Sequence, residues 1–255
     1  MSEKVDAVIL AGGGIEPELR EATGAEFKAL VSVAGRPMVA WVADSLRRSN
    51  VVERIVVVGP KEVLEALEEV KGVEERGSFE GNLAAGLEAC EARDVLVLPC
   101  DIPLLSPSTV HEFVLLYRRR RVKLAYATVP RGAVEAKFPG VRRTYAKLRE
   151  GSFTGGNMVV AERELLVRIG EIVSLSFSAR KSLVGLARLL GVGFVFKFVV
   201  GMASLRDIEA RATKVLGAPA AAIVLEKPDA AMDVDTVEHL KTVESVLASR
   251  LSQPT

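Results

Sequence analysis

Residues 5–14 read VDAVILAGGG, an almost continuous apolar run that ends in three glycines. A short apolar run bounded by glycine is typical of a strand buried on both faces, as in the middle of a parallel sheet. Glycines at the end of such a strand allow backbone N–H groups to approach a bound phosphate closely. The run therefore predicts a central parallel strand and a turn suited to a nucleotide, with a plain glycine turn as the alternative.

Strand and helix patterns alternate on both sides of this run. We expect further strands at 54–58, 94–98, 123–129, 145–148, 158–161 and 220–225, and helices at 36–48, 61–70, 106–117 and 236–249. Such alternation indicates an α/β fold, a three-layer αβα Rossmann-like arrangement with a mixed, mostly parallel sheet that binds ligands beyond the carboxyl ends of its strands. We expect one domain over residues 1–255, with a nucleotide-binding half (1–121) and an acceptor-binding half (122–255).

Composition restricts the class of protein. A net charge of +1 over 255 residues gives no strong field for nucleic acid, so an anionic ligand has to be held by a local cluster. The only cysteines, Cys90 and Cys100, lack CxxC spacing, which argues against a zinc site or a disulfide framework. The N-terminus lacks the pattern of a signal peptide. We therefore expect a cytoplasmic protein.

Residues 183–205 are strongly apolar, with Arg188 and Lys197 as their only charges. The two charges, four interrupting glycines and the missing aromatic belt disfavour a membrane span. A buried segment or a subunit contact in a homodimer is the favoured interpretation, and association with a membrane surface is the alternative.

Four further segments combine with the glycine run into one pattern. Lys28 precedes an apolar run, GRPM at 35–38 opens a helix, Asp101 follows the strand at 94–98, and MDVDT occupies 232–236. The pattern resembles the nucleotidyltransferases with a glycosyltransferase A-like Rossmann fold, the group that includes molybdopterin guanylyltransferases and sugar-phosphate nucleotidyltransferases. This resemblance implies a magnesium-dependent enzyme that attaches a nucleoside monophosphate to a phosphorylated small molecule and releases pyrophosphate.

The resemblance also implies roles for individual residues. Lys28, Asp101 and Asp235 are the expected catalytic residues, and Asp101 and Asp235 are the expected Mg²⁺ ligands, with Asp233 in reserve. The nucleotide is expected to contact Leu10, Ala11, Gly12, Gly13, Gly14, Arg20, Lys28 and Asn82. The acceptor is expected to contact Arg142, Lys147, Thr154, Gly155, Gly156 and Asn157.

Several of these residues have ordinary structural alternatives. Asn82 is as well suited to capping a helix, Asp235 or Thr236 to capping the last helix, and Asp101 to closing a turn. Arg20 comes later than the usual loop arginine, and Glu16 and Glu18 are expected to point away from phosphate. His111 and His239 are expected to be ordinary packing or surface residues. A glycosyltransferase and a catalytically silent nucleotide-binding protein remain alternatives, and the sequence leaves the triphosphate and the acceptor open.

Overall fold

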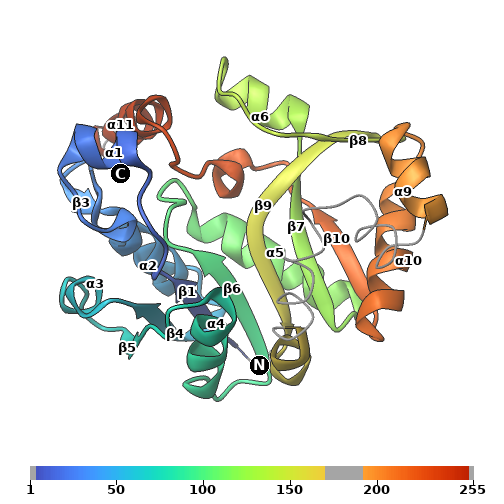
Figure 1. Cartoon of the computed structure of the whole chain (residues 1–255), viewed down its shortest axis with the longest axis horizontal. Helices are drawn as coiled ribbons and strands as arrows, with labels where there is room; N and C mark the ends of the chain where they lie inside the picture. The colour runs from blue at the N-terminus through green and yellow to red at the C-terminus, as the bar shows by residue number, and fades with distance from the viewer. Residues whose placement is uncertain (1–3, 170–191, 253–255) are drawn as a thin grey trace.

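The computed structural model describes residues 4–169 and 192–252, which form a twisted sheet with helices on both faces (Figure 1). The strand order is β10-β7-β9-β6-β1-β4-β5, and β8 pairs with β9. The main-sheet strands are β1 (Val5–Leu10), β4 (Val52–Gly59), β5 (Lys71–Glu74), β6 (Asp94–Pro99), β7 (Leu124–Pro130), β8 (Ala146–Leu148), β9 (Gly151–Glu162) and β10 (Ala220–Val224). A separate small pair joins β2 (Ser32–Val33) to β3 (Arg36–Pro37).

The helices alternate with these strands over much of the chain. They are α1 (Pro17–Thr23), α2 (Met38–Arg48), α3 (Lys61–Glu65), α4 (Phe79–Glu88), α5 (Pro107–Arg120), α6 (Arg131–Lys137), α9 (Val192–Val199), α10 (Leu205–Leu216) and α11 (Val237–Leu251), with 3₁₀ turns η1 (Lys28–Leu30) and η2 (Pro228–Ala231). The predicted three-layer α/β fold with a mixed, mostly parallel sheet is confirmed.

Strand β1 lies inside the sheet and is parallel to both neighbours, β4 and β6. Ala7 and Ile9 face a large apolar cluster that includes residues of α2, α5 and α11, whereas Val8 faces a second cluster with α4. Because consecutive side chains of a strand point to opposite faces, a strand covered on both sides has to be apolar throughout. This explains the unbroken apolar run from Ala7 to Ala11.

The carboxyl edge of the sheet brings distant segments together. Leu10 of β1 pairs with Pro99 of β6, so the glycine turn and the loop that carries Asp101 leave the sheet side by side. Strand β9 is antiparallel to β6, and its register pairs Val159 with Val97. The amino-terminal part of β9, with Asn157, therefore extends toward the same edge.

Three local predictions need correction. The helix expected at 61–70 ends at Glu65 as α3, and residues 71–74 form the short edge strand β5, parallel to β4. A short polar segment such as β5 becomes a strand because it pairs with its neighbour, and the spacing of apolar residues along the sequence does not reveal this pairing. Gly155 and Gly156 lie inside β9 instead of in a loop before it. The helix expected at 36–48 begins at Met38 as α2, because Arg36 and Pro37 form β3.

Both cysteines are buried, and their thiols are free. Of the apolar stretch 183–205, residues 183–191 lie outside the described residues, and residues 192–199 form α9. No helix in the described part of the chain is long and apolar enough to cross a membrane.

Gly86 on α4 allows this helix to pack closely on the sheet. A Cβ atom at this position would lie 2.5 Å from Val8 Cγ1 and 3.0 Å from Val58 Cγ2. We expect Gly86→Ala to lower the free energy of unfolding by about 1–3 kcal/mol, because overpacking a rigid core outweighs the gain in helix propensity. Urea unfolding measures the change.

The matched control for Gly86→Ala is Gly132→Ala in α6, where the added Cβ would meet no described atom within 4 Å. We expect Gly132→Ala to be neutral or stabilising by up to about 1 kcal/mol. A stable Gly86→Ala protein would contradict the proposed close contact between α4 and β1.

Candidate active site at the carboxyl edge of the sheet

Lys28 lies between two of the predicted carboxylates. Its Nζ atom is 2.8 Å from Asp101 Oδ2 and 2.5 Å from Asp235 Oδ1. The Lys28 side chain is only 10% exposed. The backbone N–H of Val234 donates to the carbonyl oxygen of Asp101 at 2.9 Å, which fixes the late MDVDT segment beside the loop after β6. Residues from three distant parts of the sequence thus form one charged cluster.

The cluster changes the ionisation of its members. Burial raises the pKa of Asp101; the ammonium of Lys28 opposes this shift, and the charges of Asp233 and Asp235 add to it. Burial alone would lower the pKa of Lys28, but the charges and hydrogen bonds of Asp101 and Asp235 outweigh it and raise the pKa. The pKa of Asp235 is lowered: burial opposes this shift, and the hydrogen bond and the charge of Lys28 outweigh it. Lys28 therefore stays a cation at neutral pH.

Asp101 and Asp235 suit a divalent cation. Within the described residues, Asp101 Oδ1 is buried without a hydrogen-bond partner, an uncompensated acceptor of the kind that a cation satisfies. Magnesium prefers oxygen ligands and commonly takes one or two carboxylates, with water and substrate phosphate as the rest. Across residues 4–169 and 192–252, no three or more His, Cys, Asp or Glu side chains are grouped to hold a metal. The donor set thus fits Mg²⁺ shared with a phosphate better than a metal held by protein alone.

Asp233, the reserve ligand, already has partners. Its carboxylate forms an ion pair with Arg143, and its Oδ1 accepts a hydrogen bond from Asn157 Nδ2 at 3.1 Å. Asn157 Nδ2 also donates to the carbonyl oxygen of Ala230 at 3.1 Å, and its backbone has a left-handed φ of 53°. Asp233 thus ties the MDVDT segment to β9, and Asp235 remains the carboxylate next to Lys28.

A pocket of about 500 Å³ lies beside the glycine turn. We call it the glycine-loop pocket; its lining includes Leu10, Gly12, Gly13, Gly77, Ser78, Phe79, Asn82, Pro99, Tyr126 and Asn157. A Cβ atom on Gly12 would come within 2.1 Å of Glu75 Oε2 and 2.7 Å of Asn82 Nδ2, so a larger residue here would displace the side chains of Glu75 and Asn82. Asn82 does not cap α4, because Ser78 is the N-cap residue. The Asn82 Oδ1 atom instead accepts the backbone N–H of Arg76 at 2.6 Å.

A second pocket, of about 370 Å³, lies next to Asp235. It is lined by Arg142, Arg143, Thr144, Thr154, Asp233, Asp235 and His239, and we call it the Asp235 pocket. Arg142 and Thr154, two of the expected acceptor residues, are therefore close to the charged cluster. Lys147 lies in β8, where its aliphatic stem is near Gly201.

The two glycines of β9 have a packing explanation. A Cβ atom on Gly155 would lie 2.2 Å from the Tyr126 hydroxyl, and one on Gly156 would lie 2.8 Å from Ala127 Cβ. The contact of β9 with β7 therefore favours glycine at 156, where the neighbour is Ala127, and a side chain at 155 would displace the Tyr126 ring.

Glu16 and His239 contradict the sequence-based expectation. Glu16 does not point away, because its Oε1 atom lies 3.3 Å from Lys28 Nζ. His239 is not remote from the motifs: the backbone N–H of Asp235 donates to its Nδ1 at 3.4 Å, and its ring lines the Asp235 pocket. His239, in the first turn of α11, is four residues after Asp235, and this spacing was the available signal.

Three further residues have structural partners. Arg20 is in α1 and donates from Nη2 to the carbonyl oxygen of Glu26. His111 Nδ1 lies 3.1 Å from the carbonyl oxygen of Ser49, as a packing histidine would. Thr236, and not Asp235, caps α11 by accepting the backbone N–H of His239.

Asp229 is a buried residue of the site region that the sequence did not single out. It accepts hydrogen bonds from the backbone N–H of Ser106 at 3.0 Å and from Thr109 Oγ1 at 2.8 Å. The negative charge of the Asp229 carboxylate compensates the partial positive charge of the N–H groups at the start of α5. Asp229 therefore holds η2, just before the MDVDT segment, against the loop that follows Asp101.

Comparison with known proteins supports a nucleotidyltransferase assignment. A model of the MobA-like NTP transferase domain matches residues 7–184, more than half of the chain. A hypothetical transferase from Thermus thermophilus superposes with a TM-score of 0.82 at 38% identity, over 93% of this chain and 99% of that one. A 2-C-methyl-D-erythritol 4-phosphate cytidylyltransferase, also from Thermus thermophilus, has a TM-score of 0.54 at 17% identity, over 96% and 99%, and so shares the fold.

Among curated proteins, a molybdenum cofactor guanylyltransferase of Shewanella baltica (strain OS185) is 30% identical over 132 residues. The alignment covers 50% of this chain and 64% of the relative. The chain thus covers less than two thirds of the length of the first curated relatives that it matches.

Proposed function

This chain belongs to the MobA-like NTP transferase domain family, and from that premise we propose that it transfers a nucleoside monophosphate from a nucleoside triphosphate to a phosphorylated small molecule, releasing pyrophosphate. The main support is the placement of Lys28 between Asp101 and Asp235, at the sheet edge where the glycine turn ends. Ligands of open parallel sheets bind at this edge. The family match also favours a triphosphate over a nucleotide sugar as the donor.

In the proposed reaction, an oxygen of the acceptor phosphate attacks the α-phosphorus of the triphosphate. The new P–O bond forms as the bond between the α-phosphorus and the bridging oxygen breaks, and the electron pair leaves with pyrophosphate. A phosphate acceptor is already an anion near neutral pH, so no general base is needed. The task of the protein is then to position two anions and to compensate their charge.

The described residues suit this task. Gly12 and Gly13 leave room for the nucleotide in the glycine-loop pocket, and Asn82 is held there by its bond to Arg76. Lys28 supplies a permanent positive charge for the phosphates. Asp101 and Asp235 would hold Mg²⁺, which when bound lowers the charge repulsion between the phosphates.

The acceptor is proposed to enter through the Asp235 pocket. Arg142 lines this pocket and is exposed, so its guanidinium is available to a phosphate. Arg143 is bound to Asp233, and Thr154 adds a hydroxyl. The glycine-loop pocket and the Asp235 pocket are adjacent, since Asn157 lines the first and its hydrogen-bond partner Asp233 lines the second.

The function is tested by measuring pyrophosphate release with Mg²⁺ for GTP, CTP, UTP and ATP, each with a panel of phosphorylated acceptors. We expect one combination of triphosphate and acceptor to release one pyrophosphate for each acceptor molecule consumed. We expect EDTA to abolish this release of pyrophosphate. Undiminished turnover in EDTA would contradict the assigned role of Asp101 and Asp235. Tight nucleotide binding without release for any acceptor would favour the alternative of a regulatory nucleotide-binding protein.

A further inference from the structure

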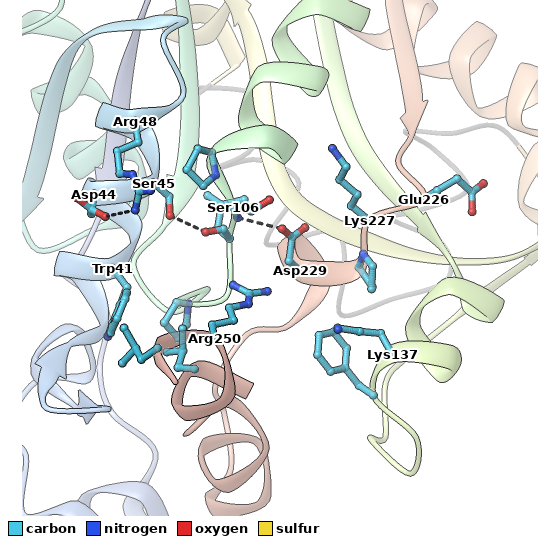
Figure 2. Close-up of a pocket in the computed structure, with 17 residues that line it drawn as sticks. Trp41, Asp44, Ser45, Arg48, Ser106, Lys137, Glu226, Lys227, Asp229 and Arg250 are labelled. Atoms are coloured by element: carbon cyan, nitrogen blue, oxygen red, sulfur yellow. Dashed lines mark hydrogen bonds and ion pairs between the residues drawn. The ribbon is translucent and has the colours of Figure 1, made fainter. Parts of the chain in front are cut away.

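A third and larger cavity, of about 900 Å³, lies outside the glycine-loop pocket and the Asp235 pocket (Figure 2). Its walls come from α2, from residues 103–107, from the end of α6, from residues 226–229 and from the end of α11. We call it the α2–α11 cavity. Lys28, Asp101 and Asp235 are not among its lining residues, so the proposed transfer reaction does not use it.

The cavity combines apolar walls with unmatched positive charge. Leu105, Phe138 and Leu247 line it and are buried. The ammonium of Lys137 and the guanidinium of Arg250 both point toward its centre, from α6 and α11 respectively (Figure 2). Arg250 uses Nη1 to donate to the carbonyl oxygen of Leu104 at 2.9 Å.

The other charged residues of the lining are paired with an opposite charge or turned away. Arg48 pairs with Asp44 of the preceding turn, and Lys227 pairs with Glu112 of α5. Asp229 has no cation as partner among the residues that the structure describes, but its carboxylate is buried and is held toward the start of α5 by hydrogen bonds from Ser106 and Thr109. The carboxylate of Glu226 points away from the centre of the cavity (Figure 2). The charge that faces the interior is thus carried mainly by Lys137 and Arg250.

We propose that the α2–α11 cavity is a binding site for a small organic anion with an apolar or aromatic body. Its volume is within the range of natural ligand pockets, about 300–1,000 Å³. Phosphate, sulfonate or carboxylate groups would bind between Lys137 and Arg250, where the apolar walls weaken competition from water. The ring or chain of the ligand would lie against Trp41, Pro107 and Leu251, lining residues whose apolar surface is accessible.

This site adjoins the backs of the two segments that carry the catalytic carboxylates. Pro103, in its lining, is two residues after Asp101. Asp229, also in its lining, comes four residues before Asp233 and is hydrogen-bonded to Ser106. A bound anion would contact both segments without entering the proposed nucleotide site.

Trp41 provides a direct test, because it lines the cavity and is the only tryptophan in the chain. We would titrate the full chain with 8-anilinonaphthalene-1-sulfonate, an aromatic anion, and follow the emission of Trp41. We expect saturable quenching by one bound probe. Lys137→Glu, at an exposed position, should weaken the affinity at least about tenfold, since it reverses one of the two charges.

The matched control is Lys214→Glu on α10, an exposed lysine outside the cavity, which should leave the affinity unchanged. Arg250→Gln is the second variant, and melting curves confirm that each protein is folded. Asp101→Asn should bind the probe as well as the unmodified chain. Quenching that persists in both Lys137→Glu and Arg250→Gln, or that disappears in Asp101→Asn, would overturn the proposal. The outcome does not depend on whether the chain transfers nucleotides.

Discussion

An Asp101→Asn variant is expected to lose about 10³-fold in kcat/KM for nucleotidyl transfer and to keep its fold. This loss is on the scale seen when one preorganised electrostatic group is removed from an active site. Asparagine preserves the volume of the side chain but removes the charge that faces Lys28 at 2.8 Å. It also removes the charge from the buried Oδ1 atom, which has no hydrogen-bond partner in the described chain and which we assign to the cation. Steady-state assays of pyrophosphate release measure the effect.

The matched control for Asp101→Asn is Asp44→Asn. Asp44 is a half-buried aspartate on α2 that pairs with Arg48 and lies outside the charged cluster. We expect the kcat/KM of Asp44→Asn to stay within about twofold, because Asp44 is not part of the charged cluster at Lys28. The melting temperature of Asp101→Asn should not fall, since a buried carboxylate with a raised pKa is costly to keep ionised. An Asp101→Asn protein that retains activity would show that this carboxylate is not part of the reaction site.

A Lys28→Met variant is expected to lose both activity and stability. Methionine has a similar length, so the change chiefly removes the positive charge from between Asp101 and Asp235. We expect kcat to fall by about 10²–10³-fold, as for other groups that compensate charge in a transition state. At pH 8 we expect the free energy of unfolding to fall by about 3 kcal/mol. This value is at the lower end of the range for breaking a buried ion pair, because the Asp235 side chain is 45% exposed.

The stability loss of Lys28→Met should depend on pH. In the unmodified chain the raised pKa of Lys28 means that its contribution is complete below about pH 10, and is lost only as pH rises through the folded pKa. In the variant, Asp101 remains buried without its cation, so its raised pKa rises further. An acid with a raised folded pKa costs stability when ionised, and the cost falls as pH decreases and the group binds a proton. The deficit should therefore be larger at pH 8 than at pH 5.

Urea unfolding at pH 8 and pH 5 measures this difference. Lys61→Met is the matched control, because Lys61 is an exposed lysine that pairs with Glu65 within α3. Lys61→Met should change the free energy of unfolding by no more than about 0.5 kcal/mol at both pH values. An equal deficit for Lys28→Met at pH 8 and pH 5 would mean that the ionisation of Asp101 is not the cause.

Local sequence patterns were sufficient for most of the fold. The run of β1 is apolar from Ala7 to Leu10 because both faces of the sheet are covered, and together with the alternation of strand and helix patterns it indicated a parallel α/β core. The patterns failed for α3 and β5, where the chain changes from helix to strand near Glu69, whose backbone has a left-handed φ of 55°. Pairing with β4, and not local propensity, gives residues 71–74 their structure.

The sequence by itself determined the α/β class, the glycine turn at the end of β1 and the candidates Lys28, Asp101 and Asp235, because each stands next to a local signal. Only the tertiary structure decided which charged groups meet. Glu16 contacts Lys28 and His239 lines the Asp235 pocket, contrary to the expectations from the sequence. The ion pair of Asp233 with Arg143 was not anticipated. Asp229 and the α2–α11 cavity depend on contacts between segments more than a hundred residues apart. Periodicity describes the face on which a side chain lies, but its partner across the fold is fixed by how helices and strands pack.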